Sequence, residues 1–315
     1  MTHKILVSDG LAEDGLALLR AVGEVTVNSK ITAAELLAAL PDYHALVVRS
    51  RTKVTKPVVE AGKNLKVVGR AGVGVDNIDV AAAVAHGLVV VNSPMAASIS
   101  VAEHTLGLML ALARLIPAAD ASLKQGQWEK SAFMGGELNG KTLGLLGLGR
   151  IGALVANRAR AFGMAVFAYD PYLSETQIRE RNAHPATFDE VIAQGDYLSL
   201  HLPLTQETRG LIGASQFTKM KKGARLICAA RGGVIDEDAL RAALDSGQLA
   251  GAALDVFAAE PPPPGSIAAH PKVVATPHVG AQTREAQARA GIAIAEEVVA
   301  VLEGKEPRWR VTSNE

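Results

Sequence analysis

The sequence predicts two α/β domains, each built on a parallel β-sheet with helices on both faces. A length of 315 residues favours about two domains. Short apolar runs rich in β-branched residues alternate with helical patterns along most of the chain, which is typical of parallel sheets buried on both faces. The runs form two consecutive series, within residues 5–91 and 142–275. We therefore predict two doubly wound domains.

The first series contains strand-like runs separated by helical patterns. The predicted strands are Ile5–Val7, Val25–Val27, Ala45–Val48, Lys66–Val68 and Leu88–Val91, and the helical patterns include Gly15–Arg20, Ala33–Ala39 and Asp79–His86. Ser93-Pro94 then leads into small residues and a long helix predicted over Ser100–Lys124. We expect this helix to connect the two domains.

The second series supplies the strands of the other domain. The predicted strands are Thr142–Leu146, Ala165–Tyr169, Tyr197–Leu200, Ala224–Ile227, Gly251–Leu254 and Val273–Ala275. A final helix, Arg284–Glu303, lies beyond this series, and no strand is predicted after it. We expect this helix to return to the first domain and cover it.

Composition and charge narrow the function classes. Hydrophobic residues make up 49% and charged residues 20% of the chain, as in ordinary globular proteins. Lys plus Arg equals Asp plus Glu at 32 each, so no overall basic field favours nucleic acid or an acidic membrane surface. The single Cys228 cannot form a disulfide within the chain, and the sequence shows no signal peptide at the N-terminus. The apolar stretch 105–116 is too short to span a membrane. We therefore predict a cytoplasmic enzyme with no membrane span.

A glycine-rich turn is the strongest local motif. Gly147-Leu148-Gly149-Arg150-Ile151-Gly152 has the pattern GxGxxG, between the strand Thr142–Leu146 and a helix predicted over Ala153–Phe162. Glycines at these positions allow a tight turn and let backbone amides approach a pyrophosphate at the helix N-terminus. The same glycines could also serve only a tight turn from strand to helix. The strand before the motif and the helix after it favour a dinucleotide site.

An acidic residue follows at the spacing that such a site needs. Asp170 ends the next strand, 18 positions after Gly152, near the usual separation of about 20 residues. Its carboxylate would accept hydrogen bonds from the adenosine ribose and repel a 2′-phosphate. The sequence therefore predicts NAD rather than NADP.

Candidate catalytic residues follow three predicted strands, at the edge where doubly wound sheets bind ligands. They are Arg231, Glu260 and His278. Small residues flank Arg231, so its guanidinium has room to bind a carboxylate through two hydrogen bonds. An imidazole can accept a hydroxyl proton while a neighbouring carboxylate stabilises the imidazolium. Taken singly, each residue also fits a structural or surface role, and the three together favour catalysis of alcohol oxidation.

These motifs together resemble the D-2-hydroxyacid dehydrogenases. The resemblance covers essentially the whole chain through Gly147–Gly152, Asp170-Pro171, Ala230–Asp236, Leu254–Pro261 and Thr276–Gly280. Within that family, Val48–Ser50, Thr52–Thr55, Gly69–Asn77 and Glu137–Lys141 look like the phosphoglycerate dehydrogenases. The resemblance implies a flavodoxin-like substrate-binding domain from residues 1–98 and 283–315 around an inserted Rossmann NAD-binding domain, 99–282. It also implies a homodimer through the NAD-binding domain.

Carried over by position, the resemblance implies His278 as acid and base, Glu260 as its partner and Arg231 as the ligand of the substrate carboxylate. It implies cofactor contacts at Val73, Gly147, Gly149, Arg150, Ile151, Gly152, Asp170, Leu202, Pro203, Ala229, Ala230, Arg231, Asp255, His278, Gly280 and Ala281. It implies substrate contacts at Arg49, Ser50, Arg51, Arg70, Val73, Gly74, Arg231 and His278. Whether Arg51 and Lys130 bind a substrate phosphate stays open.

The resemblance implies a small anionic 2-hydroxy or 2-oxo acid as substrate, in the first place 3-phospho-D-glycerate, and so a role in serine biosynthesis. A hydroxypyruvate or glyoxylate reductase, another D-2-hydroxyacid dehydrogenase, and an NAD-responsive corepressor-like binding protein are the alternatives. Many phosphoglycerate dehydrogenases carry a C-terminal regulatory domain. Since only residues 305–315 follow the final helix, we expect this chain to lack that domain.

Overall fold

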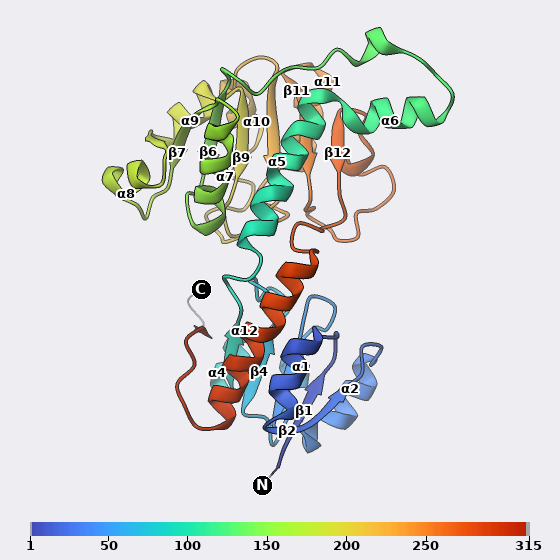
Figure 1. The fold of residues 1–315 in the computed structure, drawn as a ribbon, viewed down its shortest axis with the longest axis vertical. Helices are drawn as coiled ribbons and strands as arrows, with labels where there is room; N and C mark the ends of the chain where they lie inside the picture. Colours follow the sequence, from blue (N-terminus) through green and yellow to red (C-terminus); the bar gives the residue numbers. More distant parts are fainter. Residues whose placement is uncertain (1, 313–315) are drawn as a thin grey trace. The chain divides into compact units, whose positions relative to one another are not determined.

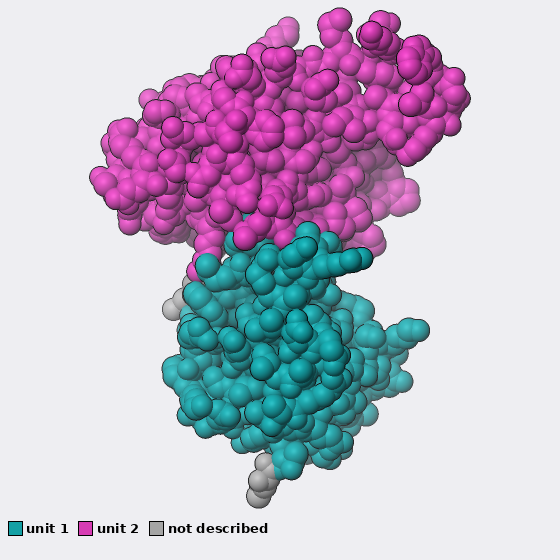
Figure 2. All heavy atoms as spheres, in the orientation of Figure 1, with its two compact units in different colours: residues 1–98, 281–315 teal, residues 99–280 magenta. Residues whose placement is uncertain are grey.

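The computed structural model describes residues 2–312. The chain divides into two compact units, coloured separately in Figure 2: unit 1 comprises residues 1–98 and 281–315, and unit 2 comprises residues 99–280. The sequence places the second boundary at residue 283, two positions later. Each unit is an α/β layered structure (Figure 1), which confirms the predicted fold class.

Unit 1 contains a six-stranded sheet in the order β13-β5-β4-β3-β1-β2. The pairs among β1–β5 are parallel and β13 is antiparallel to β5, so β1–β5 have the flavodoxin-like order 2-1-3-4-5. The elements are β1 (His3–Val7), α1 (Glu13–Arg20), β2 (Gly23–Val27), α2 (Ala33–Ala39), η1 (Leu40–Asp42), β3 (Ala45–Val48), α3 (Lys56–Ala61), β4 (Val67–Arg70), α4 (Val80–Ala85), β5 (Val89–Asn92), α12 (Arg284–Leu302) and β13 (Arg310–Val311).

Side chains of unit 1 alternate between two apolar cores, one on each face of the sheet. On β1, Leu6 packs with α2, α3 and α4, whereas Ile5 and Val7 pack with α1 and α12. This alternation follows from the period of two along a strand, and it explains why the runs of a doubly covered sheet are apolar throughout. Helix α12 packs against α1 and β4, as Figure 1 shows.

Unit 2 contains a seven-stranded parallel sheet in the order β12-β11-β10-β9-β6-β7-β8. Counted from β6, this is the Rossmann order 3-2-1-4-5-6 with one further strand. The elements are α5 (Ser98–Arg114), α6 (Ile116–Lys124), η2 (Lys130–Phe133), β6 (Thr142–Leu146), α7 (Arg150–Ala161), β7 (Ala165–Tyr169), α8 (Glu175–Glu180), β8 (His184–Pro185), α9 (Phe188–Gln194), β9 (Tyr197–Leu200), α10 (Ala214–Lys219), β10 (Ala224–Cys228), α11 (Glu237–Asp245), β11 (Leu249–Leu254), η3 (Ile267–Ala269) and β12 (Val273–Ala275).

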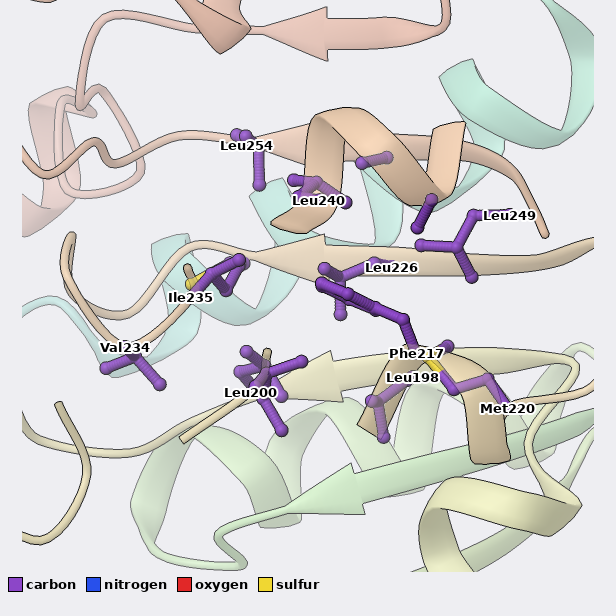
Figure 3. Close-up of a cluster of buried hydrophobic side chains, with 14 of the residues drawn as sticks. Leu198, Leu200, Phe217, Met220, Leu226, Val234, Ile235, Leu240, Leu249 and Leu254 are labelled. Carbon is purple, nitrogen blue, oxygen red and sulfur yellow. The ribbon is translucent and has the colours of Figure 1, made fainter. Parts of the chain in front are cut away.

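A large apolar cluster packs one face of the unit 2 sheet under α9, α10 and α11. Figure 3 shows Phe217 of α10, Met220 at its C-cap and Leu240 of α11 directed at Leu198 and Leu226 of the neighbouring strands. These side chains are almost completely buried. The core therefore fixes the strands whose carboxyl ends carry the candidate site.

The predicted helix over Ser100–Lys124 is wrong in one respect, because the structure divides it into α5 and α6. Leu115 between them has a left-handed φ of 54°. Pro117, in the first turn of α6, has no N–H to donate, and its ring would clash with the carbonyl of residue 113 in a continuous helix. Within residues 2–312 no single helix meets the length and apolarity of a membrane span, and α5 with α6 meets them only as a pair bent by 63°.

The expectation of no strand after the final helix is also wrong. β13 pairs with the edge strand β5 through Arg310–Val91 and Val311–Val90. Val311 is buried and joins the core of unit 1. A two-residue strand has no periodicity, so the sequence pattern does not reveal it.

Candidate active site

The glycine-rich turn joins β6 to α7 at the carboxyl edge of the unit 2 sheet. Gly147 has a φ of +87°, and a Cβ there would overlap the carbonyl oxygen of His201. A Cβ at Gly152 would likewise overlap the carbonyl oxygen of Gly147. Larger residues would therefore open the turn that the sequence predicts here.

The second glycine of the motif, Gly149, has a different environment, which fits a bound dinucleotide. An added Cβ at Gly149 meets no heavy atom within 4 Å. Gly149 is the N-cap of α7, whose first turn begins with Arg150 and Ile151, and a helix N-terminus favours an anion. Asp170 directly follows β7, next to β6 in the sheet, and its Oδ2 accepts a hydrogen bond of 2.9 Å from the N–H of Leu148.

His278 and Glu260 form the central pair of the site. Nδ1 of His278 lies 2.8 Å from Oε2 of Glu260, and both side chains are about half exposed. The other carboxylate oxygen of Glu260 accepts from the N–H of Phe257 at 3.2 Å. With Nδ1 held by a carboxylate, Nε2 is the ring atom that can exchange a proton with a ligand.

The buried carboxylate of Asp255 fixes the turn that carries His278. Its Oδ1 accepts from the N–H of Val279 at 2.9 Å and its Oδ2 from the N–H of Gly280 at 2.8 Å. The N–H of His278 donates to the Asp255 carbonyl at 2.9 Å. His278 itself has a left-handed φ of 52°, which is unfavourable for a non-glycine residue. The network therefore holds a backbone conformation that histidine does not favour by itself.

Two side chains complete this network. The Thr276 hydroxyl donates to Oδ1 of Asp255 at 2.6 Å, and Nε2 of His104 lies 3.3 Å from the same oxygen and 3.1 Å from the Thr276 Oγ1. Because the threonine proton is committed to Asp255, Nε2 of His104 must be the donor to both oxygens. Burial raises the pKa of Asp255, but the bonds from His104, Thr276, Val279 and Gly280 outweigh it, and the pKa lies below its ordinary value.

Arg231 lies in the loop after β10. Its Nη1 donates to the Ala230 carbonyl at 2.8 Å, and the backbone of Gly232 passes so close to the Phe257 carbonyl that a Cβ would overlap it.

Burial raises the pKa of the neighbouring Cys228 thiol to about 11, so this thiol stays protonated near neutral pH and is a poor nucleophile.

The basic residues of unit 1 lie where β3 and β4 end. Arg70 closes β4 opposite Val48, the last residue of β3, and Arg49 follows directly. The buried carboxylate of Asp9 accepts from the N–H groups of Arg49 at 2.7 Å and Thr52 at 3.0 Å. Burial lowers the pKa of the Arg49 guanidinium, and Asp9 opposes this shift. Asp9 therefore organises the whole 49–52 loop, which includes Ser50.

Arg51 is engaged within the same loop region. Its Nη2 lies 3.0 Å from Oδ1 of Asp9 and donates to the Ser8 carbonyl at 2.5 Å, and its Nη1 donates to the Ile31 carbonyl at 3.0 Å. The guanidinium of Arg51 is therefore bound by one carboxylate and two backbone carbonyl groups of the protein itself. Its binding of a substrate phosphate stays a prediction, and the structure shows an anchoring role.

The other predicted contacts divide between the two units. In unit 1, Val73 and Gly74 follow β4, and Ala281 begins the C-terminal segment; in unit 2, Leu202 and Pro203 follow β9, Ala229 follows β10, and Lys130 opens η2. Pro203 accepts the Thr208 hydroxyl at its carbonyl at 2.7 Å. Asp255 is 1% exposed, and the structure shows it holding the turn at residues 278–280. Its direct contact with a cofactor stays a prediction.

Sequence reasoning missed His104, Thr276 and Arg181. Arg181 donates through Nη1 to the carbonyl of Leu148 in the glycine-rich turn at 2.5 Å. His104 and Arg181 are 151 and 33 positions from their partners, so no local spacing reveals them. Among residues 2–312, no group of three or more His, Cys, Asp or Glu could hold a metal ion.

Comparison with known proteins places this site in a family. Residues 106–280 match the family described as D-isomer specific 2-hydroxyacid dehydrogenase, NAD binding domain. The D-3-phosphoglycerate dehydrogenase of Methanocaldococcus jannaschii is 52% identical over 303 residues, which are 96% of this chain and 58% of that protein. The chain thus spans a little over half the length of this relative.

Two solved structures share the fold over nearly the full length. A Thermus thermophilus protein superposes with a TM-score of 0.89 at 36% identity and covers 98% of this chain and 100% of its own. The D-lactate dehydrogenase of Aquifex aeolicus, solved with NAD and lactic acid, has a TM-score of 0.83 at 29% identity over 95% of this chain and 96% of its own. The chain belongs to the D-isomer specific 2-hydroxyacid dehydrogenase family, and residues 106–280 are its NAD binding domain.

Proposed function

We propose that the protein oxidises 3-phospho-D-glycerate to 3-phosphohydroxypyruvate with NAD, and so serves serine biosynthesis. The observation that carries the proposal is the 2.8 Å pair of His278 Nδ1 and Glu260 Oε2 in the NAD binding domain of this family. The name of the 52% identical archaeal relative supports the choice of substrate.

The chain's own residues account for the proton and the carboxylate. When bound, NAD supplies the hydride acceptor. Nε2 of His278 takes the proton of the substrate hydroxyl as the carbon–oxygen double bond forms, and Glu260 stabilises the imidazolium through Nδ1. The guanidinium of Arg231 binds the substrate carboxylate. In the reverse direction, the same imidazolium returns its proton to the oxygen.

The same proposal assigns further substrate contacts to unit 1. Arg49 and Arg70 supply positive charge at the ends of adjacent strands, which suits a doubly anionic substrate. Since Arg51 is paired with Asp9, we assign it to anchoring the loop. A cytoplasmic location belongs to the same proposal, because we assign the protein to the synthesis of an amino acid.

We also propose a homodimer through unit 2. Residues 116–134, which we name the arm, extend away from the rest of the unit in Figure 1. The arm exposes Ile116, Leu123, Trp128 and Met134, the last two by 83% and 85%, and exposed apolar surface of this kind supports a protein interface. Light scattering of the wild type and of a Trp128→Ser/Met134→Ser variant tests this: the variant should be monomeric, and an unchanged mass would exclude the arm.

A substrate panel tests the proposed activity. NADH formation is followed with 3-phospho-D-glycerate, D-lactate, D-glycerate and glycolate, and NADH consumption with the matching 2-oxo acids. The highest kcat/KM is expected for the phosphorylated pair. Preference for hydroxypyruvate or glyoxylate would identify a reductase instead, and NADH binding without turnover of any acid would favour a corepressor-like binding protein.

A further inference from the structure

Arg181 lies outside every motif of the sequence and yet contacts the glycine-rich turn. It follows α8, and its Nη1 donates to the carbonyl oxygen of Leu148 at 2.5 Å. Leu148 stands between Gly147 and Gly149, in the glycine-rich turn where we place the dinucleotide. The conformation of this backbone therefore depends on a side chain 33 positions away.

Asp170 holds the same residue through its other backbone group. The N–H of Leu148 donates to Oδ2 of Asp170 at 2.9 Å, and Oδ1 of Asp170 accepts from the N–H of Tyr172 at 3.0 Å. The N and O atoms of one residue are less than about 4 Å apart, so Nη1 of Arg181 and Oδ2 of Asp170 are within about 10 Å of each other. A cation and an anion thus flank one residue of the turn.

This arrangement matters at the adenosine ribose, where Asp170 is expected to act. A carboxylate at this position accepts ribose hydroxyls and repels a 2′-phosphate. An arginine near it has the planar set of donors that binds phosphate well. In the wild type the two side chains act on a 2′-phosphate in opposite ways, because Arg181 attracts it and Asp170 repels it. The carboxylate of Asp170 directly follows β7.

We infer that Arg181 is a second determinant of cofactor choice. It positions the turn for NAD through the Leu148 carbonyl, and it is the cation that binds a 2′-phosphate once the carboxylate of Asp170 is removed. The inference rests on the proposed use of NAD. It is independent of which 2-hydroxy acid the protein oxidises.

Arg179 offers a matched control in the same segment. It lies on α8, two positions before Arg181, and its exposed side chain pairs with Glu175 at 3.3 Å. Substituting it removes the same charge without touching the turn. Comparison of Arg181→Gln with Arg179→Gln therefore separates a specific contact from a general change of surface charge.

The experiment measures NADH and NADPH affinities of the full chain by calorimetry, without any acid substrate. Arg181→Gln should weaken NADH binding about 3- to 10-fold, because the Leu148 carbonyl loses the hydrogen bond that holds the turn and part of that bond's free energy is lost from binding. Arg179→Gln should leave the affinity unchanged. Asp170→Ser should strengthen NADPH binding relative to NADH at least about tenfold. This gain should vanish in Asp170→Ser/Arg181→Gln and persist in Asp170→Ser/Arg179→Gln and Asp170→Ser/Arg181→Lys.

Each contrary result has a distinct meaning. Equal NADPH binding by Asp170→Ser with and without Arg181 would overturn the inference and leave the proposed function intact. Failure of the wild type to bind NADH would overturn both. Thermal unfolding of every variant identifies a misfolded protein, and the lysine variant then decides the case, because it keeps the charge.

Discussion

Nδ1 of His278 lies 2.8 Å from Oε2 of Glu260, although His278 has a left-handed φ of 52°. The chain reaches this geometry through Asp255, whose carboxylate accepts the two N–H groups that follow His278. Strained backbone that is held by a hydrogen-bond network is typical of functional positions. The pair therefore depends on the buried carboxylate of Asp255, which holds the turn.

Glu260→Gln should keep the loop, because Oε1 can still accept the N–H of Phe257. The imidazolium of His278 then has a neutral partner, so its protonated form is less stable. We expect the alkaline limb of the pH–rate profile for 2-oxo acid reduction to move to lower pH. A profile that superposes on that of the wild type would show that Glu260 does not act through His278.

Asp255→Asn tests the support of the turn that carries His278. Both oxygens of Asp255 accept hydrogen bonds, so an amide nitrogen in place of either one must face a donor. We expect the free energy of unfolding to fall by about 1–3 kcal/mol for the unsatisfied group. We also expect kcat to fall while the NADH dissociation constant changes little. Weaker NADH binding with unchanged kcat would instead favour the direct cofactor contact.

Gly149→Ala tests the open space beside the glycine-rich turn. The added methyl group meets no heavy atom of the protein within 4 Å, so the melting temperature should hardly change. It would occupy the space assigned to the pyrophosphate, and we expect NADH binding to weaken at least about tenfold. Gly136→Ala, whose Cβ also meets no atom within 4 Å, is the control and should leave the affinity unchanged. Equal NADH affinity in both variants would reject this placement.

His201 predicts a pH dependence of stability. Burial lowers its pKa from 6.5 to about 4 in the folded protein. Between these values the unfolded chain binds a proton that the folded chain does not bind, so the free energy of unfolding decreases as the pH falls from 6.5 to 4. Urea unfolding at several pH values should show a smaller decrease for His201→Gln than for the wild type. His86 is exposed, so His86→Gln is the control and should show the same decrease in the free energy of unfolding as the wild type. A His201→Gln variant that shows this same decrease would contradict the assignment.

The central strands β3, β6 and β9 were predictable because each is buried on both faces. The runs Ala45–Val48, Thr142–Leu146, Ala165–Tyr169 and Tyr197–Leu200 have the predicted bounds in the structure. Continuous apolar character and flanking turn residues define such strands without knowledge of their neighbours. By contrast, β8 and β13 have two residues each, and tertiary pairing alone defines them. Pro117 was the available signal for the break at Leu115.

Residue type and local spacing single out part of the candidate site from the sequence. Gly147–Gly152 and Asp170 follow a spacing, and His278 and Glu260 lie in loops after strands β12 and β11. His104 and Arg181 carry no such signal, because the fold alone brings them to Asp255 and Leu148. The 49–52 loop shows the same limit: only the structure reveals that Asp9 neutralises Arg51.

The most direct test of the central claim compares the wild type with His278→Ala. NADH formation is measured with saturating 3-phospho-D-glycerate and NAD, and NADH affinity is measured separately by fluorescence. Loss of a general acid and base predicts that kcat falls by about 10²–10⁴-fold, with nearly unchanged NADH affinity. A His278→Ala variant that oxidises the substrate at the wild-type rate would contradict the assignment of His278 and, with it, the proposed mechanism.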